Sequence, residues 1–124
     1  MNDGSEAQVE RDFEAWLVRA RWTIGAKADH VDVRAQRGNE VLVAEVKGHT
    51  ASPGLDLDTA YGQLLRRMKA DDPNVAYAVV VPESVRKQAE RVPRWVHERL
   101  SITVYLVDAE GAVRSLPDAE VNSW

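Results

Sequence analysis

The sequence predicts an α/β layer fold, in which a mixed central sheet is flanked by helices, because helical and strand-like segments alternate along the chain. Three observations predict this class. Residues 6–21 carry apolar side chains at helical spacing, residues 75–81 are a continuous β-branched apolar run, and residues 28–36 and 40–47 are extended segments around a turn. With 124 residues, the chain is expected to form a single domain, residues 1–124.

The first predicted element is an amphipathic helix. Its apolar residues form one stripe along a helical surface: Val9, Phe13, Trp16, Leu17 and Ala20. This stripe is expected to pack against the sheet.

A β-hairpin is predicted next, because Arg37-Gly38-Asn39 separates the two extended segments and glycine supplies the positive φ of a tight turn. If Gly38-Asn39 is a two-residue turn, Arg37 pairs with Glu40, and Asp32 then lies opposite Glu45. A four-residue loop gives the same register, whereas an odd loop or a bulge does not. Hairpin geometry therefore decides whether the two acids meet.

The rest of the chain continues the alternation. A loop with Pro53-Gly54 precedes a helix, a buried strand follows, and Pro93 should kink or split the next helix. The expected segments are a loop over 48–56, a helix from about 58 to 70, a strand over 75–81, a helix over 84–100, a strand over 102–107 and a short segment near Val113.

Composition excludes several classes of protein. The chain has no cysteine, so disulfides and thiolate metal sites are absent. No apolar run approaches the roughly 20 residues of a membrane span, and the polar, acidic N-terminus is unlike a signal peptide. A cytoplasmic location without membrane contact is therefore expected. The net charge of −4 argues against a strong stand-alone DNA binder, because such proteins usually carry a basic surplus.

The end of the second extended segment carries unexpected charge. Val41, Val43, Glu45 and Lys47 share one face of this strand, and the other face is apolar, so the strand should be central and covered on both sides. Directly opposed side chains have β-carbons about 4.5–5.5 Å apart, so the carboxylates of Asp32 and Glu45 would repel each other. Mg²⁺ favours such oxygen ligands, and Lys47 could stabilise charge that develops in a transition state. The alternative is a solvated strand end with a weak ion pair.

Asp32 followed by Glu45-Val46-Lys47 resembles the signature of the PD-(D/E)xK nuclease superfamily, with its restriction-endonuclease-like fold, and is similar to small Holliday-junction-resolvase-like nucleases. The resemblance covers roughly residues 6–81. It implies an α-β-β-β-α-β core, here with an extra C-terminal helix and strand. It also implies that Asp32, Glu45 and the Val46 carbonyl bind Mg²⁺ or Mn²⁺, and that Lys47 orients the attacking water. His30-Val31 stand where many members have a proline.

Further site residues are suggested by the same resemblance. Many members place another glutamate on the first helix, where Glu10 fits best and Glu6 is the substitute. Gln63 resembles a glutamine that some branches carry on the helix after the E-x-K strand. A solvated helix face is the alternative for both positions.

Weaker candidates for nucleic-acid contact are Arg66, Arg67 and His49. Arginines on a helix are usually just solvated, and a loop histidine is as often structural as functional.

The expected function is metal-dependent hydrolysis of phosphodiester bonds in DNA. The alternative is a non-catalytic, nuclease-fold binding module or subunit of a DNA-processing or defence complex, which the acidic net charge favours. RNA remains an alternative substrate. A homodimer or a partner subunit is also open, with Trp95 or Trp124 as candidate contacts.

Overall fold

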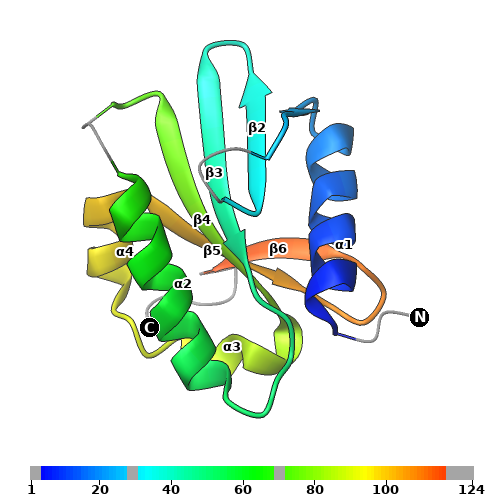
Figure 1. Ribbon diagram of the computed structural model, residues 1–124, viewed down its shortest axis with the longest axis vertical. Helices are drawn as coiled ribbons and strands as arrows, with labels where there is room; N and C mark the ends of the chain where they lie inside the picture. The colour runs from blue at the N-terminus through cyan, green and yellow to red at the C-terminus, as the bar shows by residue number, and fades with distance from the viewer. Residues whose placement is uncertain (1–3, 28–30, 69–71, 117–124) are drawn as a thin grey trace.

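The elements that the sequence predicts assemble into a six-stranded mixed sheet with helices on both faces (Figure 1). This computed structural model describes residues 4–27, 31–68 and 72–116. In chain order the elements are α1 (Glu6–Arg19), β1 (Thr23–Ile24), β2 (Val33–Arg37), β3 (Glu40–Val46), α2 (Pro53–Arg67), β4 (Val75–Pro82), the 3₁₀ turn η1 (Glu83–Val85), α3 (Arg86–Ala89), α4 (Arg94–Leu100), β5 (Ile102–Val107) and β6 (Val113–Leu116). The predicted α/β class is confirmed, and the order from α1 to β4 is α-β-β-β-α-β.

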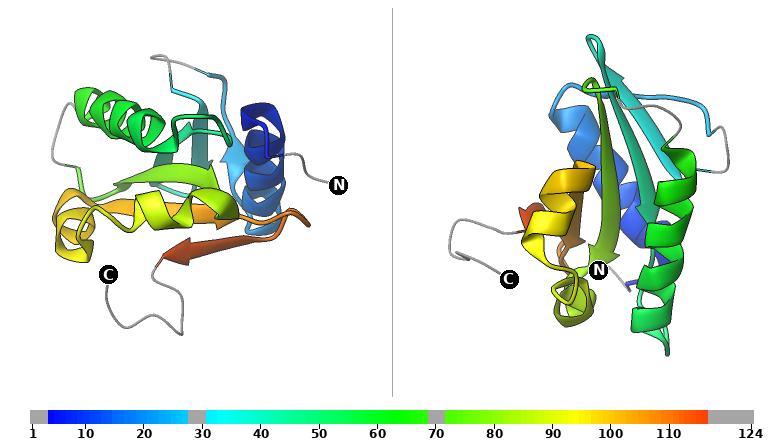
Figure 2. Two further views of the ribbon diagram at one scale, coloured as in Figure 1. Left: turned by 90° about the horizontal axis from the view of Figure 1, so that it is seen from below. Right: turned by 90° about the vertical axis from the view of Figure 1, so that its left-hand side faces the viewer.

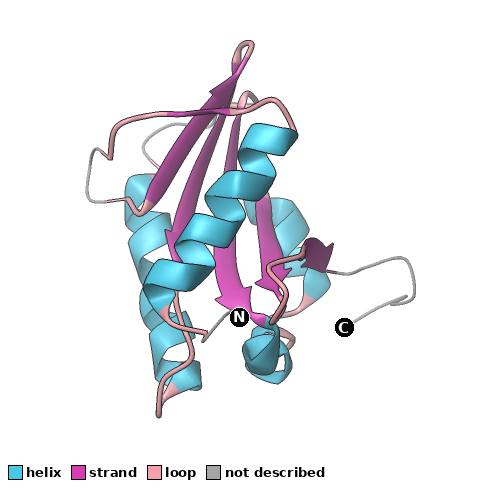
Figure 3. Cartoon of the chain, turned by 90° about the vertical axis from the view of Figure 1, so that its right-hand side faces the viewer, coloured by secondary structure: helices cyan, strands magenta, loops and turns pink. Residues whose placement is uncertain are grey.

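Helix α1 forms because a polar cap precedes an apolar stripe. The Ser5 side chain accepts a hydrogen bond from the Gln8 N–H at 3.2 Å, which satisfies one of the unpaired donors of the first turn. Val9, Phe13 and Leu17 are completely buried. The helix ends at Arg19 rather than at Arg21, which has a φ of 73°. Figure 3 shows α1 lying across the strands.

The predicted hairpin register is confirmed. Arg37 pairs with Glu40 and Val33 pairs with Ala44, and Gly38 in the turn has a φ of 60°. The first predicted strand is shorter than expected, since β2 begins at Val33 rather than at Ala28, and residues 28–30 lie outside the described part of the chain.

A short strand that periodicity did not reveal lies at the edge of the sheet. β1 pairs with β2 through Thr23↔Gln36 and Ile24↔Ala35. Two residues are too few to show an alternating pattern. β1 completes the three-strand unit that the family resemblance implied.

Strand β3 occupies the centre of the sheet, as predicted. It pairs with β2 in an antiparallel and with β4 in a parallel arrangement, and β4 in turn is parallel to β5. Leu42, Ala44 and Val46 pack in the core beneath α1, while Val43 belongs to the core beneath α2. Figure 2 shows α1 and α2 on opposite sides of the strands. Both faces of β3 are therefore covered before Glu45 is reached.

The helices after β3 differ from the prediction at their ends. α2 begins at Pro53, not near Asp58, because proline fits the first turn of a helix, where its missing N–H has no partner to lose. It ends at Arg67, and residues 69–71 lie outside the described ranges. Pro93 splits the next helix, as expected, into α3 and α4. None of the described helices combines the length and the apolar character that a membrane span requires.

A buried polar pair links α2 to α4. The Tyr61 hydroxyl and His97 Nε2 are 2.6 Å apart, and His97 is only 4% exposed. Burial lowers the pKa of His97 to about 4, because the charged imidazolium loses its hydration. The folded protein therefore holds His97 neutral at a pH where the unfolded chain would protonate it.

His97→Phe should reduce the loss of stability in acid. Since the folded pKa lies below the unfolded value of about 6.5, the unfolded state binds more protons and wild-type stability falls as the pH drops from about 6.5 to 4. Relative to wild type, the variant should gain on the order of 2 kcal/mol between pH 7 and about pH 4.5, measured by urea unfolding. Tyr61→Phe, which removes the same hydrogen bond but keeps the histidine, should show no such gain. An equal gain in both variants would contradict this account.

Candidate active site

The two predicted acids meet at the carboxyl end of β3. Asp32 directly precedes β2, and its Oδ2 accepts a hydrogen bond from the Val46 N–H at 2.8 Å. This bond continues the hairpin ladder with a side chain in place of a backbone carbonyl. It holds the Asp32 carboxylate beside Glu45, which is only 1% exposed.

Glu45 is an acid in an unfavourable place. Burial raises the pKa of Glu45 to about 7, and the hydrogen bond and negative charge of Asp32 raise it as well. Arg67 and Lys47 act in the opposite direction through their positive charges. Glu45 Oε1 has no hydrogen-bond partner among the described residues. The pair can therefore be stabilised by a shared proton or by a cation.

Lys47 lies close to this acidic pair. It is half-buried, directly follows β3, and its N–H donates a hydrogen bond to the Val80 carbonyl at 2.9 Å. This bond extends the pairing of β3 with β4 by one residue beyond Val46. The lysine backbone is thus as fixed as the strand itself.

Gly48 lets the end of β3 approach the start of α1. A β-carbon at Gly48 would lie 2.3 Å from the Glu6 nitrogen and 2.7 Å from the Ser5 carbonyl carbon. One residue further, the His49 N–H donates a hydrogen bond to the Gly4 carbonyl at 2.7 Å. The close contact with the start of α1 therefore explains why the residue after the E-x-K signature is a glycine: a side chain would not fit there.

This contact brings Glu6, the substitute candidate on the first helix, towards the acids. Burial raises the pKa of Glu6, the negative charge of Asp32 raises it further, and the positive charge of Lys47 lowers it. Glu10, the preferred candidate, instead forms an ion pair with Lys27 at 2.7 Å. That pair lies at the margin of the site, because Asp32 contributes to the raised pKa of Lys27, after the hydrogen bond to Glu10. The catalytic role of either glutamate stays a prediction.

Sequence reasoning missed Lys27. It lies in an aperiodic stretch between β1 and β2, where only its closeness to Asp32 along the chain could have drawn attention.

Helix α2 contributes two polar side chains to the same face of the sheet. Gln63 and Arg67 are half-buried and one helical turn apart, and neither Gln63 Oε1 nor Arg67 Nε has a hydrogen-bond partner among the described residues. Arg67 is close enough to Glu45 for its charge to lower the pKa of that carboxyl. Arg66, in contrast, is exposed. Of the two predicted phosphate-contacting arginines, Arg67 is the one near the acids.

Other candidates lie farther away or outside the described residues. His49 Nδ1 lies 2.9 Å from Ser84 Oγ, beyond Lys47 along the chain. Trp95 is 61% exposed on α4. His30, which hairpin register would place opposite Lys47, and Trp124 fall in the parts of the chain that the structure does not describe.

A metal ion would find few protein ligands here. Among the described residues there is no group of three or more His, Asp or Glu side chains that could hold one. Two carboxylates nevertheless suit Mg²⁺, which keeps several waters and is usually bound by one or two carboxylates together with substrate phosphates. Glu45 Oε1, which has no hydrogen-bond partner among the described residues, and the raised pKa of Glu45 indicate a carboxyl that a bound cation would stabilise. The donor set therefore fits a hydrated Mg²⁺ or Mn²⁺.

These features define a class: an α/β protein with a mixed sheet, in which a buried acid near the end of the central strand lies beside an acid that precedes the neighbouring strand and is followed by a lysine. Comparisons with known proteins give matches at the level of the fold and none at the level of the sequence. No protein-family model matches the sequence, and neither does any curated protein.

Solved structures do resemble the chain. A XisH family protein from Nostoc punctiforme superposes with a TM-score of 0.62 at 18% sequence identity, over 86% of this chain and 95% of that one. An fdxN element excision controlling factor protein from Anabaena variabilis gives a TM-score of 0.60 at 15% identity, over 87% and 97% of the two chains. At such low identity the likeness shows a shared fold across nearly the whole of both neighbours.

Gly48→Ala should destabilise the protein strongly. The new methyl group would collide with the backbone of Ser5 and Glu6, which cannot rotate away, so we expect a loss of about 1–3 kcal/mol or more. Gly62→Ala is the matched control: its nearest contact is the flexible end of Arg66, and alanine favours a helix interior by about 1 kcal/mol over glycine. Thermal unfolding should move in opposite directions for the two variants. Equal shifts of the unfolding temperature in the two variants would contradict the close contact between α1 and Gly48.

Glu45→Gln should stabilise the metal-free protein increasingly as the pH rises. Because the folded pKa is raised, the proton held by folded Glu45 favours folding at low pH, and this contribution is lost as the pH rises through about 7. Between about pH 5 and pH 8 the variant should gain on the order of 2 kcal/mol over wild type, measured by urea unfolding with EDTA. Glu40→Gln, at the exposed start of the same strand, should show no such trend. A pH-independent difference for Glu45→Gln would contradict the buried-acid interpretation.

Proposed function

We propose that this protein is a metal-dependent nuclease that hydrolyses phosphodiester bonds in DNA at the carboxyl end of β3. The observation that carries the proposal is the buried Glu45 carboxyl, which lies beside Asp32 and is followed by Lys47, and whose Oε1 has no partner in the part of the chain that the structure describes. An acid in a strand covered on both faces costs stability. Such a cost is typical of a functional site.

Asp32 and Glu45 would hold Mg²⁺ or Mn²⁺, with the Val46 carbonyl as the further ligand that the PD-(D/E)xK resemblance implies. When bound, the ion would lower the pKa of a coordinated water and offset negative charge on the phosphate. The Val46 N–H keeps Asp32 in place for this task through its 2.8 Å hydrogen bond.

The other charged groups would act on the phosphate and the water. Lys47 projects an ammonium from a fixed strand end, where it would stabilise the negative charge of the phosphodiester as it is attacked. Arg67 and Gln63 offer an unpartnered donor and an unpartnered acceptor on the α2 side of the acids. Arg67 would bind a phosphate oxygen, and Gln63 would accept a hydrogen bond from water.

A second candidate is a DNA-excision factor with the nuclease fold that does not cut. The name of one structural neighbour describes a factor that controls excision of an element. The net charge of −4 also suits a subunit of a complex in which a partner protein supplies most of the binding to nucleic acid. A role in DNA processing is common to both candidates.

The deciding experiment is cleavage of plasmid, single-stranded, flap and four-way-junction DNA with Mg²⁺ or Mn²⁺, beside EDTA. Wild type should cut in a metal-dependent way, and Lys47→Ala should cut about 10²–10³-fold more slowly, since a charge that stabilises the transition state is removed. Glu45→Gln should abolish cutting by removing a metal ligand. Arg66→Ala, on the exposed face of α2, is the control and should cut nearly as fast as wild type.

Unchanged cutting by Glu45→Gln would overturn the assignment of the site. If the folded wild type cuts none of these substrates and its unfolding temperature does not rise with Mg²⁺ or Mn²⁺, the non-cutting excision factor is the better account.

A further inference from the structure

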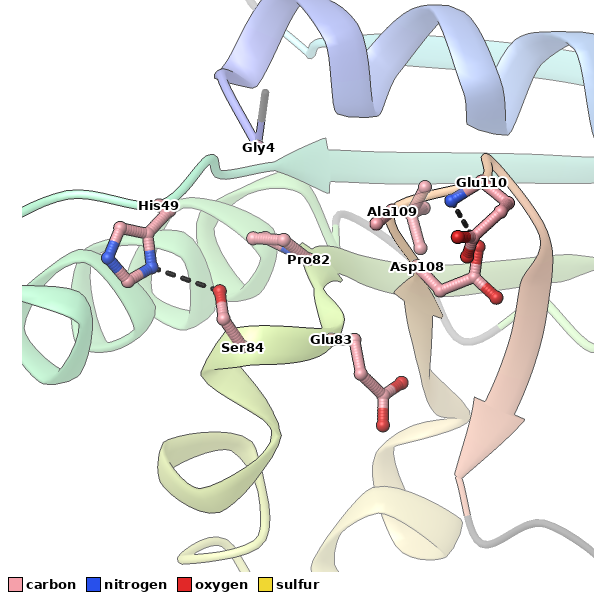
Figure 4. A pocket seen from close by; sticks show the side chains of 9 residues that line it. Gly4, His49, Pro82, Glu83, Ser84, Asp108, Ala109 and Glu110 are labelled. Atoms are coloured by element: carbon pink, nitrogen blue, oxygen red, sulfur yellow. Dashed lines mark hydrogen bonds between the residues drawn. The ribbon is translucent and has the colours of Figure 1, made fainter. Parts of the chain in front are cut away.

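A hollow lies beside the candidate active site, at the carboxyl ends of two parallel strands. Its volume is about 530 Å³, within the roughly 300–1,000 Å³ of small-molecule sites. Pro82 and Val107, the last residues of β4 and β5, line it together with Ala109 (Figure 4). Crevices outside the carboxyl ends of strands are where open α/β sheets usually bind ligands.

Two residues that line the hollow are close in the chain to residues of the Asp32–Glu45 site. His49 lines it and follows Lys47 by two residues, while Gly4 lines it and precedes Glu6 by two. The two wall residues are joined by the hydrogen bond from the His49 N–H to the Gly4 carbonyl. Since consecutive Cα atoms are 3.8 Å apart, the Cα atoms of His49 and Lys47 lie within about 7.6 Å of each other. A chain-like ligand could therefore occupy both places at once.

The lining does not suit a phosphate. None of the residues around the hollow is a lysine or an arginine. Its two best-buried acids are only partly paired. Glu83 Oε1 pairs with Arg86 and Arg114, whereas Glu83 Oε2 has no hydrogen-bond partner among the described residues. Asp108 Oδ1 accepts hydrogen bonds from two backbone N–H groups of the β5–β6 turn at 2.9 Å each. The hollow therefore presents acceptor oxygens, among them Glu83 Oε2, and no cationic side chain from its lining residues.

What remains is an apolar floor with hydrogen-bonding groups at the rim. His49 and Ser84 are exposed and joined through Nδ1 and Oγ at 2.9 Å, which leaves the ring face and Nε2 of His49 outside that bond. Glu110 is an exposed carboxylate on the other side of the opening (Figure 4). Apolar surface, an aromatic ring and acceptor oxygens match a flat heterocycle that carries amino groups.

We infer that this hollow holds one unpaired base of the nucleic-acid strand whose phosphate lies at Lys47. The base would pack against Ala109 and the ring of His49, both exposed, and its exocyclic amino group would donate a hydrogen bond to Glu110 or Ser84. Adenine, guanine and cytosine carry such a group, and thymine does not. The inference rests on the proposed function and narrows it: the substrate has unpaired bases, as in single strands, flaps or junctions.

The test measures binding without cleavage. Fluorescence anisotropy with EDTA would follow a labelled adenine-rich single strand, a strand of the same length with an abasic position, and a duplex. Ala109→Trp should fill the hollow and weaken binding of the intact single strand about tenfold, the loss expected for one stacked base. Ala112→Trp is the matched control, because Ala112 is exposed in the same turn but does not line the hollow; it should bind like wild type.

The outcomes separate this inference from the nuclease proposal. The inference stands if Ala109→Trp binds the intact strand as weakly as wild type binds the abasic one, with duplex binding unchanged, even if no DNA is cut. Equal binding by wild type, Ala109→Trp and Ala112→Trp would overturn the base-binding hollow while leaving metal-dependent cutting untouched. Tighter binding of a lysine-rich peptide than of the single strand, lost in Ala109→Trp, would also overturn it and point to a basic protein segment as the occupant.

Discussion

The rest of this structure depends on the burial of one carboxyl group, that of Glu45, in a strand whose two faces are covered. Asp32 lies beside it because its carboxylate takes the Val46 N–H in place of a backbone acceptor. Burial, and after it the hydrogen bond and negative charge of Asp32, raise the pKa of Glu45, so the folded chain holds an acid pair that a proton or a cation would stabilise. A side chain chosen for stability alone would be apolar here, as Val43 and Val79 are nearby on the same face of the sheet.

Much of the surrounding architecture serves to hold this acid pair in place. Gly48 allows the start of α1 to touch the end of β3, which brings Glu6 towards Asp32 and Lys47. From the other side, α2 brings Arg67 near Glu45, and Gln63 lies one helical turn before Arg67. The site is therefore built where three elements converge, and the hollow lined by Gly4 and His49 adjoins the same α1–β3 contact. If the proposals hold, one short segment, Lys47 to His49, separates the phosphate from the base.

The fold was predictable wherever local chemistry decided it. Gly38-Asn39 predicted a tight turn, and the structure confirms the register in which Asp32, one residue before Val33, falls opposite Glu45. A continuous apolar run predicted β4, and Pro93 predicted the break between α3 and α4. The predicted secondary structure was wrong where a strand was too short to show a pattern, and where a helix began with a residue that is common in both loops and helix starts. β1 has too few residues to alternate, and Pro53-Gly54 suggests a loop although proline also suits the first turn of a helix.

The sequence by itself determined the class of fold, the register of the hairpin and the identity of the Asp32, Glu45 and Lys47 constellation, because each depends on spacing along a strand or around one turn. Only the tertiary structure decided which helical side chains join that constellation. The charges of Asp32 and Lys47 act on Glu6, while Glu10 pairs with Lys27 at the margin of the site, and Arg67 lies close enough to Glu45 for its charge to lower the pKa of that carboxyl. Helical periodicity places such neighbours within a turn of each other, but the position of each helix on the sheet, set by packing contacts distant in sequence, selects which of them faces the acids.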